Sequence, residues 1–309
     1  MHTGTCADDE NGIKRTKSKT EVMYIPGKSK KPPTELKADI PIANGTMYVS
    51  YTHQFKYLGS ILSDDLRDDA DIDNRIAKAN AQLGAFGNVF NSSIDMRIKR
   101  TMYIQNHINT LLFGCESWTL TADNLRKLEV YHHKALRRIL GINMYHVEKF
   151  HIRNEHVRNA LDIPCITDII RQGQFFFLGK IARMPETKNQ RKIINAWRPV
   201  ARPTGRPLKT ARHTFTETLE TVLGRTIMKG DHGCAKDWMP LARDQKTWSA
   251  LFTKWENSRR KQQLRFDFHE FIDYRHFTLH NRKLDPTAEP FQPRVLDPTA
   301  EPFIPATKH

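Results

Sequence analysis

The stretch Phe55-Lys56-Tyr57-Leu58-Gly59-Ser60 marks a change in the kind of structure that the sequence predicts. Before it, short apolar runs alternate with turn residues, which is typical of strands and hairpins. After it, apolar residues recur at steps of three and four over about 200 residues, a spacing that indicates amphipathic helices. We therefore place this stretch at the boundary between a β-rich segment and a helical body.

The chain carries a strong excess of positive charge. Its 309 residues include 49 Lys and Arg against 34 Asp and Glu, a net charge of +15. Such an excess predicts a polyanionic partner, most often nucleic acid. Four cysteines are too few for a disulfide framework and fit a reducing compartment. No apolar run reaches 18 residues and no signal core opens the chain, so we expect an intracellular protein of the nucleus or cytoplasm without a membrane contact.

The segment before the boundary predicts several short strands. One covers 19–25 and ends at Pro26-Gly27. Apolar runs around 40–42 and 47–49 flank Asn44-Gly45, a strong hairpin signal, and a further strand is expected from Tyr51 to Tyr57.

The segment after the boundary predicts helices separated by capping and turn residues. One helix is expected to begin near Thr121-Ala122-Asp123 and to end with Arg137-Arg138 in its last turn, followed by Gly141. A loop is expected at 224–237, and the prolines and glycine of 198–210 indicate a basic linker. The expected helices cover 72–90, 94–112, 121–140, 154–161, 166–184, 211–223 and about 248–260.

Two acidic clusters invite a metal-site interpretation, and neither supports one. Asp8-Asp9 has the adjacent carboxylates that polymerases use to hold metal ions, but turn residues flank it, so we interpret it as a solvated loop. The cluster from Asp64 to Asp73 fails as a calcium loop because Asn74 stands where glycine is needed and Asn80 where glutamate is needed. We expect its carboxylates to stabilise the start of a helix.

The histidines at 132, 133, 146, 151 and 156 have no cysteine partners at metal-ligand spacing. We interpret them as surface or capping residues, and we predict no metal site in this chain.

Basic residues recur on two predicted helices and in the linker, where they could contact phosphates. Neighbouring aromatics could stack on bases or sugars, namely Tyr103, Trp118, Tyr131 and Trp197. The alternative is that these positions form an ordinary solvated face. The candidate phosphate contacts are Arg97, Lys99, Arg100, Lys134, Arg137, Arg138, Arg202 and Arg206.

An ordered series of motifs resembles the C-terminal part of reverse transcriptases encoded by non-LTR (LINE-type) retrotransposons. The resemblance runs from about residue 15 to about residue 212 and depends on the order and spacing of the pieces. The pieces are Lys17-Ser18-Lys19-Thr20-Glu21, Phe55 to Ser60, Ile72-x-x-Arg75-Ile76-x-x-Ala79, Leu111 to Trp118, Leu136 to Gly141, Leu178 to Met184 and Gly205-Arg206-Pro207.

The resemblance implies a role for each part of the chain. Phe55, Lys56, Tyr57, Leu58 and Gly59 correspond to the primer grip, which holds the primer 3′ end. The helices of 72–140 correspond to the thumb, which tracks an RNA–DNA template–primer duplex, and 150–212 to the connector. The family's catalytic aspartates and the Mg²⁺ that they bind would precede residue 1. This chain alone is therefore expected to hold no cofactor and to be inactive as an RNA-directed DNA polymerase.

One piece departs from the family pattern. Gly179-Lys180-Ile181 stands where the family usually has Gly-His-Val or Gly-His-Ile, which argues against a histidine function at that point.

We expect a mainly α fold with a small N-terminal β-hairpin or palm remnant, a helical thumb and connector bundle, and a disordered C-terminal tail containing a 12-residue repeat. The function expected is that of a truncated reverse-transcriptase fragment that binds template–primer nucleic acid. The alternative is a host-adopted or non-functional helical nucleic-acid-binding or scaffold protein. The sequence does not predict the oligomeric state. The expected segments are 1–62 (palm edge), 63–145 (thumb), 146–212 (connector and linker), 213–270 (C-terminal helices) and 271–309 (tail).

Overall fold

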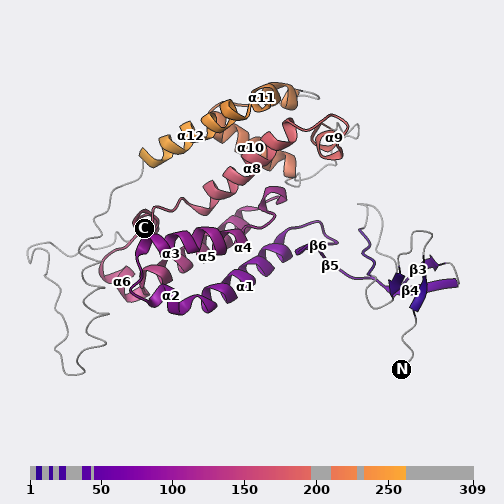
Figure 1. The fold of residues 1–309 in the computed structure, drawn as a ribbon, viewed down its shortest axis with the longest axis horizontal. Coiled ribbons are helices and arrows are strands. Elements are labelled where there is room, and N and C mark those ends of the chain that lie inside the picture. Colours follow the sequence, from indigo (N-terminus) through magenta and orange to yellow (C-terminus); the bar gives the residue numbers. More distant parts are fainter. Residues whose placement is uncertain are drawn as a thin grey trace, which may run out of the picture. The chain divides into compact units, whose positions relative to one another are not determined.

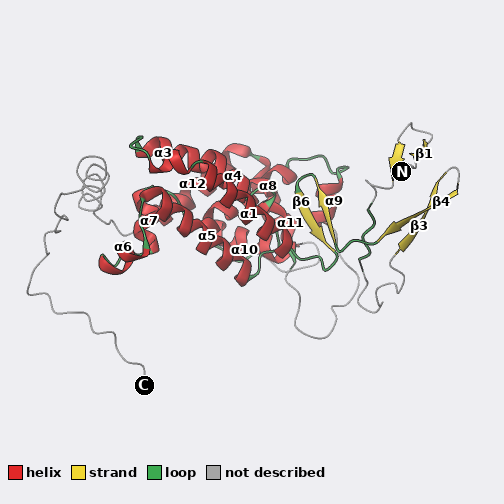
Figure 2. Cartoon of the chain, turned by 90° about the horizontal axis from the view of Figure 1, so that it is seen from below, coloured by secondary structure: helices red, strands yellow, loops and turns green. Residues whose placement is uncertain are grey.

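The computed structural model describes residues 5–8, 14–16, 21–25, 37–42, 45–195, 210–227 and 233–261. These residues are mainly helical, with short antiparallel strands near the N-terminus (Figure 1 and Figure 2), which confirms the expected fold class. The described residues all belong to one compact unit, which lies within Met1–Gln263. The expected disordered tail lies outside the described residues, and the finer division into five segments stays a prediction.

The described strands form three separate antiparallel pairs. The expected hairpin between 40–42 and 47–49 is present, but Gly45 pairs with Ile42 and so belongs to a strand instead of the turn. In place of a strand over 19–25, the described part has one bridge between Val22 and Tyr51. The pairs are β1 (Thr5–Asp8) with β2 (Lys14–Thr16), β3 (Lys37–Ile42) with β4 (Gly45–Ser50), and β5 (Gln54–Tyr57) with β6 (Ser60–Ser63).

The loop expected at Asp8-Asp9 is wrong for Asp8, which lies in a strand. Asp8 is the last residue of β1 and pairs with Lys14 of β2. Asp9 lies outside the described residues. Backbone pairing across this short hairpin outweighs the turn composition of the flanking residues.

The first half of the helical part follows the predicted helices closely. The expected end of the helix over 121–140 is confirmed, because Gly141 ends it with φ +69°, and at its start the Thr121 side chain accepts a hydrogen bond from Asn124 N. The predicted helix over 94–112 is interrupted by a π-helical turn. The elements are α1 (Asp69–Ala85), α2 (Gly87–Asn91), α3 (Met96–Met102), the π-helical η2 (Tyr103–Ile108), α4 (Asn109–Leu111), the 3₁₀ turn η3 (Cys115–Ser117) and α5 (Ala122–Leu140).

The second half contains helices that the sequence does not predict. Two of them, α6 (Met144–Lys149) and α9 (Asn189–Asn195), are short, and α11 (Gly233–Arg243) begins inside the expected loop of 224–237. Burial of Trp238 and Met239 favours α11 in spite of Pro240 within it. The elements are α6 (Met144–Lys149), α7 (Asn154–Ala160), α8 (Ile166–Ala182), α9 (Asn189–Asn195), α10 (Ala211–Leu223), α11 (Gly233–Arg243) and α12 (Gln245–Lys261). None of the described helices is long and apolar enough to cross a membrane.

Helix α8 packs against α12 through one close aromatic contact. The Phe175 and Trp248 rings stack with their centroids 3.9 Å apart, and Trp248 Nε1 donates to the carbonyl of Phe175 at 3.0 Å. A Cβ on Gly179 would lie 2.4 Å from Trp248 Nε1. Glycine at 179 therefore permits this packing, and the Gly-Lys-Ile piece has a structural explanation.

Five aromatic and imidazole side chains form a buried group where η2 meets α5, which we call the Tyr–His cluster. The Tyr103 hydroxyl lies 2.8 Å from His132 Nδ1, and the Tyr131 hydroxyl lies 3.2 Å from His107 Nε2. His133 Nε2 accepts a hydrogen bond from Arg158 at 2.8 Å. The cluster consists of Tyr103, His107, Tyr131, His132 and His133, all at most 6% exposed.

The histidines therefore divide into two kinds. His146 and His156 accept a hydrogen bond at Nδ1 from the backbone of the helix N-cap residue, which confirms the capping interpretation for these two. His132 and His133 are buried, so the surface or capping interpretation is wrong for them. Burial lowers the pKa of His107 to about 4, of His132 to about 3 and of His133 to about 4.

We expect the folded state to lose stability as the pH falls below about 6.5, the ordinary histidine pKa. Below that value the unfolded chain binds protons that the three neutral imidazoles of the Tyr–His cluster exclude. Each buried histidine can contribute up to about 1.4 kcal/mol of lost stability per pH unit until its own folded pKa is reached. Urea unfolding at pH 7, 6 and 5 measures the loss.

The variant His132→Gln should show a smaller loss between pH 7 and pH 5, whereas exposed His151→Asn, at a position with φ +49°, should keep the loss of the unchanged chain. An unfolding free energy that is equal at pH 5 and pH 7 would contradict this account.

Candidate functional site

The β5–β6 hairpin presents the residues that resemble a primer grip. Tyr57 pairs with Ser60, so Leu58 and Gly59 form a two-residue turn. Both have positive φ, +47° for Leu58 and +92° for Gly59, as the right-handed twist of a tight hairpin requires. Leucine rarely adopts this conformation, and here it places an apolar side chain at the tip, 79% exposed.

One face of the hairpin is aromatic and open. Phe55 and Tyr57 lie two residues apart on β5 and therefore on the same face, with ring centroids 6.4 Å apart. Leu62 is opposite Phe55 on β6. Tyr57 is 57% exposed and Leu62 is 47% exposed, so this face offers stacking and apolar contact to a ligand.

The hairpin is held on α1 by a buried pair of opposite charges, which we call the Asp71–Arg75 pair. Asp71 is 3% exposed and Arg75 is 5% exposed. The Asp71 carboxylate accepts hydrogen bonds from the Ile61 backbone N–H at 2.9 Å and from Trp118 Nε1 at 3.0 Å. It lies 3.7 Å from Arg75 Nε.

The arginine of the Asp71–Arg75 pair reaches the turn itself. Arg75 donates to the Gly59 carbonyl at 2.8 Å and to Ser60 Oγ at 3.2 Å. Its guanidinium also lies 4.4 Å from the centroid of the Phe113 ring. The pair thus connects the turn and β6 of the hairpin to α1 and to the segment after α4.

The other carboxylates of the acidic cluster are engaged separately. Asp68 accepts from the Thr119 backbone N–H at 2.6 Å, and burial raises its pKa. Asp73 pairs with Lys127 at 3.0 Å, and Asp64 lies 2.7 Å from His53 Nδ1. No group of three or more metal-ligating side chains occurs among the described residues, so the Mg²⁺ of the resembled family finds no fitting ligand set in that part of the chain.

The acidic cluster does begin a helix, since Asp69 and Asp71 are in the first turn of α1. The expectation that these charges only favour the helix dipole is nevertheless incomplete. Asp71 makes buried contacts with the hairpin. Asp71 and Arg75 stand four residues apart on one helix face, but this spacing is equally common on exposed faces, so the sequence carries no signal that the pair is buried.

Positive charge gathers beside the hairpin as well. The pKa of Lys78 on α1 is lowered, first by burial and then by the charges of Arg75 and Lys56. Lys56 is exposed on β5. Lys78 was absent from the predicted site residues, and its proximity to Lys56 makes it a further candidate for contact with an anion.

The structure removes Lys99 from the set of predicted surface cations. Lys99 is 2% exposed, and its ammonium donates to the carbonyls of Phe90 at 2.8 Å and Ser92 at 2.5 Å. These carbonyls end α2, where they have no partner within the helix. Lys99 therefore holds α2 against α3, and its charge is directed inward.

Two of the predicted cations already bind other parts of the chain. Arg100 donates to the carbonyls of Leu161 and Asp162, both at 2.8 Å, and pairs with the Asp162 carboxylate at 3.0 Å. Arg137 donates to Asn154 Oδ1 at 3.0 Å. Both are half-buried, so they offer less to an external phosphate than fully exposed residues would.

Three predicted cations are exposed: Arg97 on α3, and Lys134 and Arg138 on α5. Arg202 and Arg206 lie outside the described residues. The exposed set is therefore smaller than the sequence indicates.

The prediction that Tyr103, Trp118 and Tyr131 stack on bases is wrong. All three are buried, between 0% and 6% exposed. Tyr103 and Tyr131 belong to the Tyr–His cluster, and Trp118 binds Asp71. Trp197 lies outside the described residues. The exposed aromatics among the described residues include instead Tyr57 on the hairpin, Phe113 after α4 and Tyr145 on α6.

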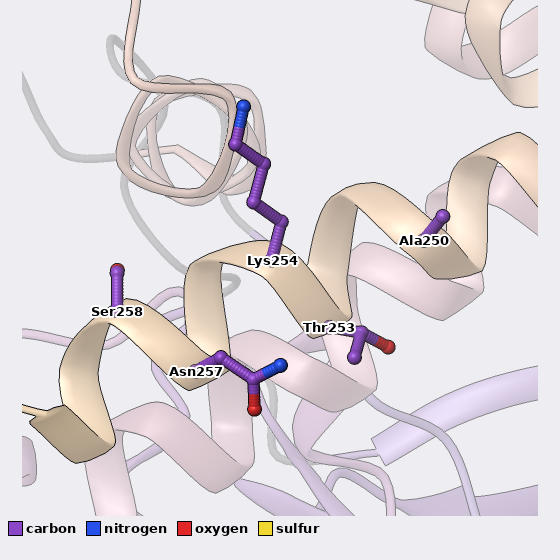
Figure 3. Close-up of a pocket in the computed structure, with 5 residues that line it drawn as sticks. All are labelled: Ala250, Thr253, Lys254, Asn257 and Ser258. Carbon is purple, nitrogen blue, oxygen red and sulfur yellow. The ribbon is translucent and has the colours of Figure 1, made fainter.

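A shallow pocket lies along α12. Figure 3 shows its lining residues Ala250, Thr253, Lys254, Asn257 and Ser258, with Lys254 and Asn257 extending to different sides of the helix. These residues come from one helix and bring one charged group together with small polar ones. This arrangement provides no converging set of catalytic side chains.

Comparisons with known proteins give one distant similarity. The chain is 21% identical over 214 residues to an uncharacterised transposon-derived protein of Caenorhabditis elegans, covering 68% of this chain and 74% of that protein. No family model matches the chain, and no solved structure matches it. The similarity points to a transposon-related origin.

We expect Asp71→Ala to destabilise the folded chain by about 3–5 kcal/mol, because it leaves Arg75 buried without its counter-charge. Asp69→Ala is the matched control and should cost at most about 1 kcal/mol, the contribution of a charge at a helix start. Urea unfolding measures both. Amide hydrogen exchange at Ile61 should also accelerate in Asp71→Ala alone. Equal effects of the two substitutions would contradict the role of the pair.

Proposed function

We propose that this chain binds an RNA–DNA template–primer duplex, as the palm-edge, thumb and connector part of a reverse transcriptase of the non-LTR retrotransposon type. The observation that carries the proposal is the exposed aromatic face of the β5–β6 hairpin, fixed on α1 by the Asp71–Arg75 pair. The similarity to a transposon-derived protein and the net charge of +15 support it.

The hairpin would contact the end of a primer strand. Tyr57 and Leu58 offer an aromatic ring and an apolar tip to the terminal sugar and base. Lys56 points to the opposite face of β5 from Tyr57, toward the side on which Lys78 adds positive charge. The tight turn keeps these groups in a fixed arrangement, so a ligand pays little ordering cost when it binds.

The thumb-like helices would contact the phosphate backbone. Arg97, Lys134 and Arg138 are the exposed cations of the predicted set. Arg100 and Arg137 would contribute less because they already bind other parts of the chain. Backbone contacts of this kind give affinity without sequence preference and make binding depend on salt.

The proposed activity is binding without polymerase chemistry. In the resembled family the catalytic aspartates lie on palm strands that precede the primer grip, and Asp68, Asp71 and Asp73 of this chain are each engaged in a separate contact. We therefore expect no primer extension by this chain on its own. The alternative is a host-adopted binding or scaffold protein. Primer extension separates the two, because only a reverse-transcriptase fragment should support DNA synthesis when an intact palm of the same family is supplied.

The proposal predicts tight, salt-sensitive binding to a fluorescein-labelled RNA–DNA hybrid with a recessed DNA 3′ end. Binding is measured by fluorescence anisotropy between 50 and 200 mM salt. In the variant with Arg97, Lys134 and Arg138 all replaced by alanine, the plot of log affinity against log salt should be less steep. Its slope should fall in magnitude by about one for each phosphate contact that is lost. Tyr57→Ala should weaken binding to the recessed end by about tenfold, the effect of one lost stacking contact.

Ile193→Ala provides the matched control, because Ile193 is 71% exposed on α9, outside the proposed surface. It should leave both the affinity and the salt slope unchanged. Binding of the unchanged chain that is no tighter than that of albumin at low salt would overturn the proposal.

A further inference from the structure

Helix α6 presents apolar side chains to solvent in a way that the fold does not require. It is six residues long, and none of its side chains is buried. Met144 is 59% exposed and Tyr145 is 58% exposed. Large exposed apolar groups that neighbour one another often mark a binding surface.

The helix is nevertheless held in a defined conformation. Ile142 before it and Ile152 after it are buried, 6% and 5% exposed. The Asn143 side chain accepts from the His146 backbone N–H at 2.9 Å, and His146 Nδ1 accepts from the Asn143 backbone N–H at 3.2 Å. This reciprocal cap satisfies two donors at the helix start. Figure 2 shows α6 next to α7.

A cation and three aromatic rings lie together on this segment. Lys149 Nζ lies 5.4 Å from the Tyr145 ring centroid and 5.7 Å from that of Phe150, and it donates to the Tyr145 hydroxyl at 3.1 Å. The His146 ring packs edge-on to Tyr145, with centroids 5.9 Å apart. These contacts orient the Tyr145 ring and place positive charge at its side.

The surrounding sequence is strongly basic. Residues 134–153 contain five Lys or Arg and one carboxylate, Glu148, so the formal net charge of this segment is +4. Arg137 on the last turn of α5 donates to Asn154 at the start of α7, so the two helices that flank α6 are joined. The cations are Lys134, Arg137, Arg138, Lys149 and Arg153.

We propose that α6 is a stacking platform for an unpaired nucleotide, with Tyr145 against the base and with Lys149, Arg153 and the basic residues of α5 near the backbone phosphates. The choice of nucleic acid as the partner rests on the proposed function above. Single-stranded nucleic acid fits best because an exposed ring on a short helix without buried side chains can reach the face of an unstacked base, which a duplex conceals. The net positive charge disfavours an apolar protein partner.

The test compares three fluorescein-labelled probes by anisotropy with the full chain: a single-stranded 12-nucleotide pyrimidine strand, the same strand with abasic sites, and a blunt RNA–DNA hybrid. Tyr145→Ala should weaken binding to the base-bearing strand about 5- to 100-fold, the range for one stacked base. The same substitution should change the affinities for the abasic strand and for the hybrid by no more than about twofold. Tyr145→Phe should keep most of the affinity for the base-bearing strand because the aromatic ring remains.

Ile193→Ala is the control for loss of an exposed apolar side chain and should change none of the three affinities. The proposal is overturned if Tyr145→Ala leaves the base-bearing strand unaffected. It is also overturned if Tyr145→Ala lowers the affinities for all three probes equally. A substitution that only abolishes self-association of the protein in sedimentation would likewise overturn it, because that result indicates a protein contact. Tyr57→Ala separates the two proposals, because it should act on the recessed hybrid and not on the single strand.

Discussion

The buried Asp71–Arg75 pair is the interaction on which the candidate site depends. Two strands of four residues each are too short to form a stable hairpin alone. The carboxylate binds the backbone of one strand and the guanidinium binds the turn, while Trp118 supplies a third partner. Because charges are costly to bury without partners, this arrangement has little freedom to relax. The exposed ring of Tyr57 and the strained Leu58 are therefore presented from a fixed base, which suits the recognition of a strand end.

The number of basic residues in the sequence is larger than the number that are exposed and could contact a polyanion. Lys99 serves the carbonyls at the end of α2, and Arg100 joins α3 to the loop before α8. The aromatic residues divide in the same way, since Tyr103 and Tyr131 belong to the Tyr–His cluster while Tyr57 and Tyr145 are open to solvent. Basic and aromatic side chains that are exposed to solvent lie in separate places on the hairpin, α3, α5 and α6. A surface of this kind favours contacts along a nucleic-acid backbone over recognition of a sequence.

The sequence was most informative where apolar periodicity and caps agree. The bounds of α5 and α10 follow from their periodicity, and the caps of α5 match the residues at its ends. Apolar periodicity could not predict helix α6, because this helix has no buried face of its own. Its ends are instead fixed by a cap and by flanking isoleucines. Helix α11 contains Gly233 and Pro240, which local propensity penalises, and the burial of Trp238 and Met239 explains it. The burial of Asp71 could not be inferred, because the same i, i+4 pair is common on exposed helix faces. The primer-grip assignment came from the order of motifs and stays a proposal.

The central claim is that the β5–β6 hairpin meets the end of a primer. Photo-crosslinking tests it most directly, with an RNA–DNA hybrid that carries a 5-iodouracil base at the recessed DNA 3′ end, followed by mass spectrometry of the crosslinked peptides. The account predicts crosslinks within 54–63, centred on Tyr57, and their loss in Tyr57→Ala. Crosslinks confined to α8 or to α10–α12, with none within the hairpin, would contradict it.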